Sequence, residues 1–109
     1  MPFQEAKGIR YLQFESLSCP EIVHAIFTRQ GGVSPGPWRS LNVGGTVGDR
    51  LERVSENRQR AFKVLGLDPS TMYDVWQVHG KRVVHTDSSR PAHVPHQKAD
   101  AILTAEPGV

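Results

Sequence analysis

The sequence predicts an α+β fold, and three observations lead to that class. Residues 49–65 carry apolar side chains at helical spacing between a possible N-cap and a glycine. Several shorter segments rich in Val, Ile and aromatic residues have the length or the alternation of strands. The 10 glycines and 8 prolines fall mostly between these segments, which predicts long irregular connections. A mixed α/β sheet is the alternative arrangement of the same elements.

Two strands and a long loop are predicted before the helix. Residues 9–14 alternate weakly with a period of two, and residues 22–28 form a clearer strand, in which His24 is expected to be a hydrogen-bonded core side chain. Residues 29–37 are rich enough in glycine and proline to predict a loop with special backbone angles. Arg29 and these glycines could present a guanidinium and backbone N–H groups to an anion such as phosphate, and a plain strand connection is the alternative. Residues 40–42 could likewise be a turn that uses the side chain of Asn42.

Residues 49–65 carry the strongest helix signals. Asp49 is the expected N-cap, with Glu52 three residues later, and Gly66 stands where a left-handed residue closes a helix. Glu56 and Arg60 are predicted to form an i,i+4 ion pair away from the apolar face. The stripe expected to pack on a sheet consists of Leu51, Val54, Arg58, Ala61, Phe62 and Leu65. We therefore expect a mainly structural role for this helix.

The second half is predicted to contain a hairpin, a loop and a final strand. Residues 73–79 and 82–87 read as strands joined by a type II′ turn at Gly80-Lys81, in a register that pairs His79 with Arg82 and Gln77 with Val84. Gln77 and His79 would then share one sheet face at a strand end. Residues 88–98 are too broken by proline for regular structure, and residues 99–104 read as a strand. The chain ends shortly after that strand, at EPGV, so we expect a cut chain whose fold is incomplete at the C-terminus.

Composition excludes several classes of protein. With 109 residues, the chain is one small domain or part of a larger one. A net charge of +2 with scattered Lys and Arg argues against a nucleic-acid partner. The single cysteine, Cys19, allows no internal disulfide, and no apolar run reaches the roughly 18 residues of a membrane span. Residues 1–10 lack the pattern of a secretory signal, so we expect a cytoplasmic enzyme without membrane partners.

Among the five histidines, His79 is the best candidate for ligation or catalysis, because it ends a predicted strand directly before a glycine. His93 and His96 are expected to be solvated loop residues, and His85 to be structural. The sequence contains none of the common zinc-site or nucleophile motifs, and Cys19 has no evident base nearby. The residues alone do not supply the roughly three protein ligands that a catalytic zinc needs.

Three segments in one order give a more specific signal. Residues 27–42 read FTRQGGVSPGPWRSLN, residues 47–49 and 56–58 read VGD and ENR, and residues 77–80 read QVHG. Together they resemble the YfiH-type family, also called laccase-domain, multicopper polyphenol oxidase or peptidoglycan editing factor proteins. Residues 99–104 (ADAILT) and 107–109 (PGV) match its next segment, so the resemblance covers most of residues 22–109.

The resemblance implies a mixed-sheet α/β sandwich about twice this length, of which residues 1–109 are the N-terminal portion of a single domain. It implies a zinc ion, or alternatively copper, bound by His79 together with a Cys and a His beyond Val109. The implied substrates are purine nucleosides and phosphate, with adenosine deamination and phosphorolysis of adenosine, inosine or methylthioadenosine. In such an enzyme Arg29 would bind phosphate or substrate oxygens, Asn42 would orient substrate, and Gln77 would support the metal site.

Several alternatives accompany this interpretation. Laccase-like polyphenol oxidation is the weaker one, because it needs several coppers and more histidines than the chain offers. A peptidoglycan editing factor differs in its substrate and not in its residues. The 109 residues alone are expected to be inactive as an enzyme, and a non-catalytic remnant or binding module is the third alternative. Trp38 stands where the family more often has Tyr, which argues only against a phenolic hydroxyl at that position.

Overall fold

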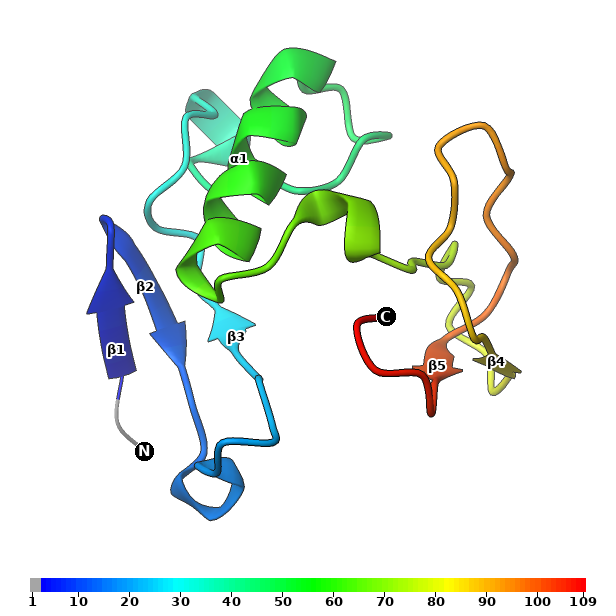
Figure 1. Cartoon of the computed structure of the whole chain (residues 1–109). Coiled ribbons are helices and arrows are strands. Elements are labelled where there is room, and N and C mark those ends of the chain that lie inside the picture. The colour runs from blue at the N-terminus through cyan, green and yellow to red at the C-terminus, as the bar shows by residue number, and fades with distance from the viewer. Residues whose placement is uncertain (1–2) are drawn as a thin grey trace. The chain divides into compact units, whose positions relative to one another are not determined.

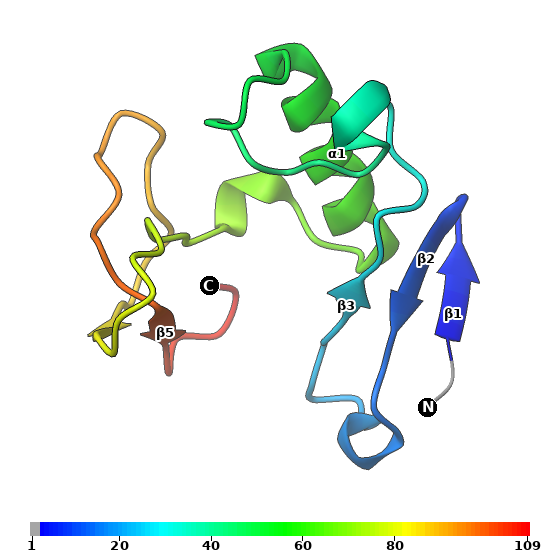
Figure 2. The same cartoon turned by 180° about the vertical axis from the view of Figure 1, so that it is seen from behind.

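The computed structural model describes residues 3–109, which form two compact units divided between Leu67 and Asp68. The first unit contains a three-stranded antiparallel sheet and the helix α1, and the second contains a two-stranded parallel sheet. Figure 1 and Figure 2 show these elements from opposite sides. The α+β class predicted from the sequence is confirmed. No helix within residues 3–109 is long and apolar enough to cross a membrane.

The sheet of the first unit begins with a hairpin that the sequence analysis did not predict. Strand β1 (Phe3–Ala6) pairs antiparallel with β2 (Ile9–Leu12). Lys7 and Gly8 connect them with φ angles of 53° and 79°, the positive pair that a type I′ turn requires. The prediction of a strand at residues 9–14 is thus correct for its first four residues only.

The strand predicted at residues 22–28 is much shorter in the structure. Strand β3 is Ile26–Phe27, which pairs antiparallel with β2. His24 takes part in other bonds: its Nε2 accepts from the Phe14 N–H at 2.9 Å, and its carbonyl accepts from the Gln13 side chain at 3.1 Å. The hydrogen bond predicted for His24 is confirmed, whereas the core position is not, because His24 is half-buried and lies before β3. These bonds occupy the Phe14 N–H and the His24 carbonyl, which a longer ladder would use, so the strand begins at Ile26, four residues later than predicted.

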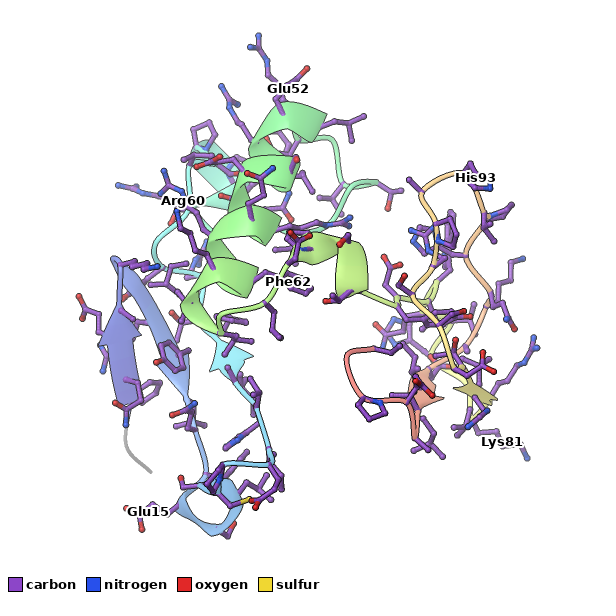
Figure 3. All side chains as sticks on the ribbon, viewed as in Figure 1. Glu15, Glu52, Arg60, Phe62, Lys81 and His93 are labelled. Carbon is purple, nitrogen blue, oxygen red and sulfur yellow. The ribbon has the colours of Figure 1, made fainter. Side chains whose placement is uncertain are left out.

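Helix α1 spans Leu51–Val64, and Gly66 follows it with a φ of 70°, as predicted. The predicted N-cap was wrong: Arg50 is the N-cap, with no side-chain capping bond, because the Asp49 carboxylate accepts from Ser34 and Asn42 instead. The Glu56–Arg60 pair is confirmed at 3.0 Å. In Figure 3, Arg60 and Phe62 project from different sides of the helix.

The buried face of α1 agrees with the predicted stripe in part, because Val54 and Ala61 are buried as predicted. Leu51 is 67% exposed, whereas Val54, Asn57 and Ala61 are buried. Helix α1 contacts β2, whose Ile9 is fully buried. The polar Asn57 therefore takes a core position, which the apolar count of the sequence analysis missed.

The 3₁₀ turns η1 (Glu15–Leu17), η2 (Gly36–Trp38) and η3 (Pro69–Thr71) add short regular pieces to the connections. In η3, the Asp68 carboxylate caps the turn by accepting from the Ser70 N–H at 2.8 Å. That bond holds the pKa of Asp68 below its ordinary value. The loop predicted at residues 29–37 is irregular apart from the start of η2.

The predicted hairpin of the second unit was wrong. Strand β4 (Val83–His85) pairs in parallel with β5 (Ala101–Leu103), which lies inside the predicted strand at residues 99–104. Trp76 makes a single parallel bridge to Lys98 and does not belong to a hairpin strand. The segment around Gly80 turns onto the carboxylate of Asp100, and this contact prevents the local type II′ pairing.

Residues 88–98 form the predicted loop, which ion pairs tie to the preceding segment. Asp74 accepts from Arg90 Nε at 2.8 Å and pairs with His96 Nε2 at 2.9 Å. Arg90 also donates to the carbonyls of Pro91 and Val94 within the loop. Figure 3 shows His93 at the tip of this loop.

Candidate functional site

Four polar side chains of the first unit, Ser34, Asn42, Asp49 and Asn57, form what we call the polar knot. Asn57 is fully buried; its Oδ1 accepts from the Val33 N–H at 2.8 Å, and its Nδ2 donates to Ser34 Oγ at 2.9 Å and to the Asn42 carbonyl at 2.8 Å. Ser34 Oγ in turn donates to Asp49 Oδ2 at 2.5 Å. One helix residue thereby fixes two separate parts of the loop between β3 and α1.

The Asp49 carboxylate is the charged member of the polar knot. Its side chain has no solvent-exposed surface, and it accepts from Ser34, from Asn42 Nδ2 at 3.2 Å and from the Arg50 N–H at 2.8 Å. The Ser34 hydroxyl is the largest influence, and it holds the pKa of Asp49 below its ordinary value against the opposing effect of burial. The knot therefore contains an ionised carboxylate at neutral pH.

Arg29 lies at the rim of a surface pocket next to the polar knot. Its carbonyl accepts from the backbone N–H groups of Ser40 and Leu41, both at 2.9 Å, and its Nε donates to the Arg39 carbonyl at 2.7 Å. Within residues 3–109 its two terminal guanidinium nitrogens donate to no other residue. The pocket, of about 480 Å³, is lined by Arg29, Pro37, Trp38, Arg39, Leu41, Asn42 and Val47; we call it the Arg29 pocket.

The glycines after Arg29 have a packing role. A Cβ added to Gly32 would stand 1.9 Å from the Ser40 carbonyl oxygen, and one added to Gly31 would stand 2.6 Å from the Gly8 carbonyl oxygen. The N–H groups of Gln30, Gly32, Val33 and Ser34 all donate to oxygens of the protein. Most backbone N–H groups of this loop are therefore engaged within the protein, and the Arg29 guanidinium is the more available group for an anion.

Asn42 holds its own turn, as the sequence suggested. Its Oδ1 accepts from the Gly44 N–H at 3.0 Å, while its Nδ2 donates to the Gly44 carbonyl and to Asp49 at 3.2 Å each. Trp38 closes the other side of the same loop by donating from Nε1 to the Val47 carbonyl at 3.0 Å. Both side chains line the Arg29 pocket in a fixed orientation.

In the second unit, His79 lies exposed in a turn with a left-handed backbone. Its φ is 57°, a region that costs an L-residue roughly 1–2 kcal/mol. Asp100 Oδ1 accepts from the Val78 N–H at 3.1 Å, and Asp100 Oδ2 accepts from the Gly80 N–H at 2.8 Å. Gln77 is also exposed and precedes this turn by one residue. The structure thus places Gln77 and His79 on one short segment, although not in the predicted strand pairing.

The remaining histidines differ in their surroundings. His85, His93 and His96 are all exposed, as expected for the two loop residues His93 and His96, and His96 in addition pairs with Asp74. Burial raises the pKa of Asp74, but the hydrogen bonds from Arg90 and His96 outweigh it and leave that pKa below its ordinary value. This pairing orders the loop at residues 88–98.

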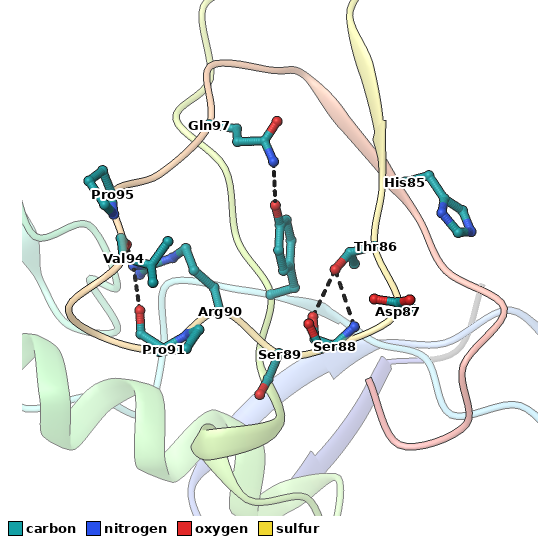
Figure 4. Close-up of a pocket in the computed structure, with 11 residues that line it drawn as sticks. His85, Thr86, Asp87, Ser88, Ser89, Arg90, Pro91, Val94, Pro95 and Gln97 are labelled. Carbon is teal, nitrogen blue, oxygen red and sulfur yellow. Dashed lines mark hydrogen bonds between the residues drawn. The ribbon is translucent and has the colours of Figure 1, made fainter.

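A second pocket, of about 400 Å³, lies entirely within the second unit (Figure 4). Tyr73, one of its lining residues, accepts from Gln97 Nε2 at 3.1 Å, while Thr86 Oγ1 donates to the Ser88 carbonyl at 2.8 Å. Several of its polar lining side chains, Tyr73, Thr86 and Gln97, are thus engaged in bonds within the lining.

Within residues 3–109, no three His, Cys, Asp or Glu side chains gather closely enough to hold a metal ion. His79 offers one imidazole, and Cys19 is exposed in the first unit. The described residues therefore do not complete a metal site by themselves.

The sequence analysis missed three residues that shape these sites. Asn57 could have been found, because it stands three residues after Val54 and four before Ala61, on the helical period of the buried face. Ser34 and Asp100 carry no comparable signal, because their partners are distant along the chain.

Comparison with known proteins places these features in a wider group. A family model described as "Multi-copper polyphenol oxidoreductase laccase" matches residues 23–109. "Purine nucleoside phosphorylase ORF3" of Streptomyces griseus is 44% identical over 87 residues, covering 79% of this chain and 35% of that protein. "Purine nucleoside phosphorylase" of Deinococcus radiodurans is 38% identical over 104 residues, covering 95% and 38% respectively. The chain thus spans little more than a third of the length of these relatives.

Two solved structures share the fold. YlmD from Geobacillus stearothermophilus has a TM-score of 0.80 and 28% identity, covering 97% of this chain and 41% of that one. The hypothetical protein YfiH of Bacillus licheniformis has a TM-score of 0.79 at 24% identity, covering 98% and 41%. These likenesses agree with the fold class predicted from the sequence.

Proposed function

The chain belongs to the multi-copper polyphenol oxidoreductase laccase family, and from this premise we propose that it forms the N-terminal part of an enzyme domain that cleaves purine nucleosides with phosphate. The observation that carries the proposal is the purine nucleoside phosphorylase name shared by relatives such as those from Streptomyces griseus and Deinococcus radiodurans. The proposal of a longer domain is supported by the lengths of these relatives, of which the chain covers 35% and 38%.

The Arg29 pocket has features that suit such a substrate. Phosphorolysis adds a phosphate oxygen to C1′ of the ribose and breaks the bond from C1′ to the purine nitrogen, which leaves with the bonding electrons and takes up a proton. A guanidinium with unengaged terminal N–H groups binds phosphate oxygens in a fork. The pocket is an open hollow of about 480 Å³, and the aromatic Trp38 lines it together with Arg29, which would suit a flat purine base.

We assign roles to the candidate residues on this basis. Arg29 binds phosphate or substrate oxygens, and Asn42, whose amide is already held by its own turn, orients substrate at the pocket. His79 is the proposed ligand of a metal, zinc or alternatively copper, and Gln77 supports it. A bound zinc would supply a Lewis acid. The described residues offer such an ion a single imidazole, so the role of His79 extends to a metal only with donors from elsewhere.

The decisive experiment measures purine release from inosine with and without phosphate. It uses the 109-residue chain and the longer polypeptide of its natural reading frame. Release that requires phosphate, falls in Arg29→Ala and is partly kept in Arg29→Lys would support the proposal, because Lys retains the charge but not the fork. We expect the KM for phosphate to rise at least about tenfold in Arg29→Ala.

The matched control is Arg50→Ala, which removes an exposed arginine of the same unit whose side chain makes no cap bond. It should leave the KM for phosphate unchanged. Release of hypoxanthine that is independent of phosphate, or no release by either polypeptide, would contradict the proposal. Deamination of adenosine or oxidation of phenols in place of phosphorolysis would select one of the alternative activities.

A further inference from the structure

A single carboxylate holds the turn that carries His79. The two N–H groups bonded by Asp100 belong to Val78 and Gly80, the residues on either side of His79. One oxygen of the carboxylate bonds each group, at 3.1 and 2.8 Å. The peptide planes before and after His79 are thereby tied to one point, which sets the direction in which the imidazole leaves the backbone.

The backbone of His79 needs such support. A φ of 57° is uncommon for a residue other than glycine and persists where surrounding contacts determine it. Within the described residues, the carboxylate of Asp100 supplies those contacts. Gly80 leaves room for it, because a Cβ at that position would stand 3.3 Å from Asp100 Oδ2.

Asp100 is itself well anchored. Its N–H donates to the Arg82 carbonyl at 3.0 Å, and the preceding Ala99, which is fully buried, donates to the Trp76 carbonyl at 3.0 Å. The next residue, Ala101, begins β5 and pairs with Val83 of β4. The carboxylate thus projects from the start of a paired strand, so the parallel sheet fixes the position of the His79 turn.

The geometry points to Asp100 as the positioning residue for His79. Each of its carboxylate oxygens binds a backbone N–H group, so it acts through the conformation of its neighbour and not on substrate. This inference rests on the proposed function in one respect: His79 must be a side chain that the reaction uses.

The first test needs no activity. In the 109-residue chain, NMR should show a strong intraresidue HN–Hα cross peak for His79, which marks positive φ, and slow amide exchange at Val78 and Gly80. Asp100→Ala should remove the cross peak and speed both exchange rates about tenfold. Asp87→Ala is the control, because it removes an exposed carboxylate of the same unit and should change none of these signals. An unchanged His79 in folded Asp100→Ala would overturn the inference.

A second variant covers the case in which Asp100→Ala unfolds the unit. Gly80→Ala leaves the Asp100 carboxylate in place but crowds it, because Asp100 Oδ2 would lie 3.3 Å from the new Cβ. It should speed exchange at Val78 in the same direction by a smaller factor. Unaltered exchange and an unaltered His79 cross peak in this variant would equally count against the inference.

The second test uses phosphorolysis by the longer polypeptide. Asp100→Ala should lower kcat about tenfold and leave the KM for phosphate unchanged, and Asp100→Asn, which keeps one acceptor oxygen, should recover part of the loss. A raised KM with an unchanged kcat would refute a positioning role. If the unmodified enzyme shows no phosphorolysis, the proposed function fails, and the NMR result still decides whether Asp100 holds His79.

Discussion

Removal of the Asn57 side chain tests the polar knot most directly. In Asn57→Ala, the Val33 N–H and the Asn42 carbonyl both lose the partner found for them in the structure, and Ser34 loses one of its two bonds. A buried group left unpaired costs about 1–3 kcal/mol. Val33 lies near the surface at 38% exposure and can regain water, so its share falls at the lower end. We therefore expect a loss of about 2–4 kcal/mol in the free energy of unfolding.

That loss is large for a chain of 109 residues, since domains of this size have about 5–15 kcal/mol in total. Urea unfolding followed by circular dichroism should show a lower midpoint with a similar slope. Ser55→Ala, an exposed position on the same helix, is the control and should stay within about 0.5 kcal/mol of the parent. A loss below about 1 kcal/mol in Asn57→Ala would show that the loop does not depend on this side chain.

Three further predictions concern other contacts. Ser34→Ala should raise the pKa of Asp49 toward 3.8. A lowered carboxyl pKa gives stability that is present above the unfolded pKa and is lost as the pH falls through the folded pKa. Acid unfolding of the variant below about pH 4 should therefore begin at a higher pH than in the parent, as a circular dichroism titration would show. Gly32→Ala should cost about 3 kcal/mol or prevent folding, since its Cβ would meet a backbone oxygen at 1.9 Å, while Gly45→Ala, with its nearest contact at 3.8 Å, should leave the melting temperature nearly unchanged. Asp74→Asn should weaken the bonds to Arg90 and His96 and speed amide exchange at Val94 about tenfold. The control is Asp87→Asn. Equal exchange at Val94 in the two variants would show that other contacts order the loop at residues 88–98.

The parts of the fold that were predictable from the sequence are those determined by near neighbours. Helix α1, its closing Gly66 and the Glu56–Arg60 pair all depend on residues within a few positions of one another. The loop at residues 88–98 was predictable for the same reason, because proline acts on its own backbone. Local chemistry decided these elements, and tertiary contacts did not overrule it.

The failures share the opposite cause. Asp49 has the residue type of an N-cap, but its carboxylate instead accepts hydrogen bonds from Ser34 and Asn42, which lie 15 and 7 residues earlier. Gly80-Lys81 favours a hairpin by itself, but Asp100, 20 residues from Gly80, turned the segment into the parallel arrangement. Neither competitor is visible in a local window of sequence.

The candidate residues show the same division. Arg29 and Asn42 were singled out from the sequence, and the structure brings them to one pocket through the turn at residues 40–42. Gln77 and His79 share one short segment, whereas the sheet face expected for them does not exist. The catalytic and binding roles of all four residues remain predictions.

The polar knot also has a consequence for the order of folding. Asn57 reaches residues that lie 24, 23 and 15 positions earlier, whereas every backbone bond of α1 closes within a single turn. Helical turns close in well under a microsecond, while loops of this length gain their contacts only after a larger entropic cost. The helix should therefore form first and serve as the template on which the loop settles last. Weakening the knot would then shorten the lifetime of the folded unit and leave the rate of its formation almost unaltered.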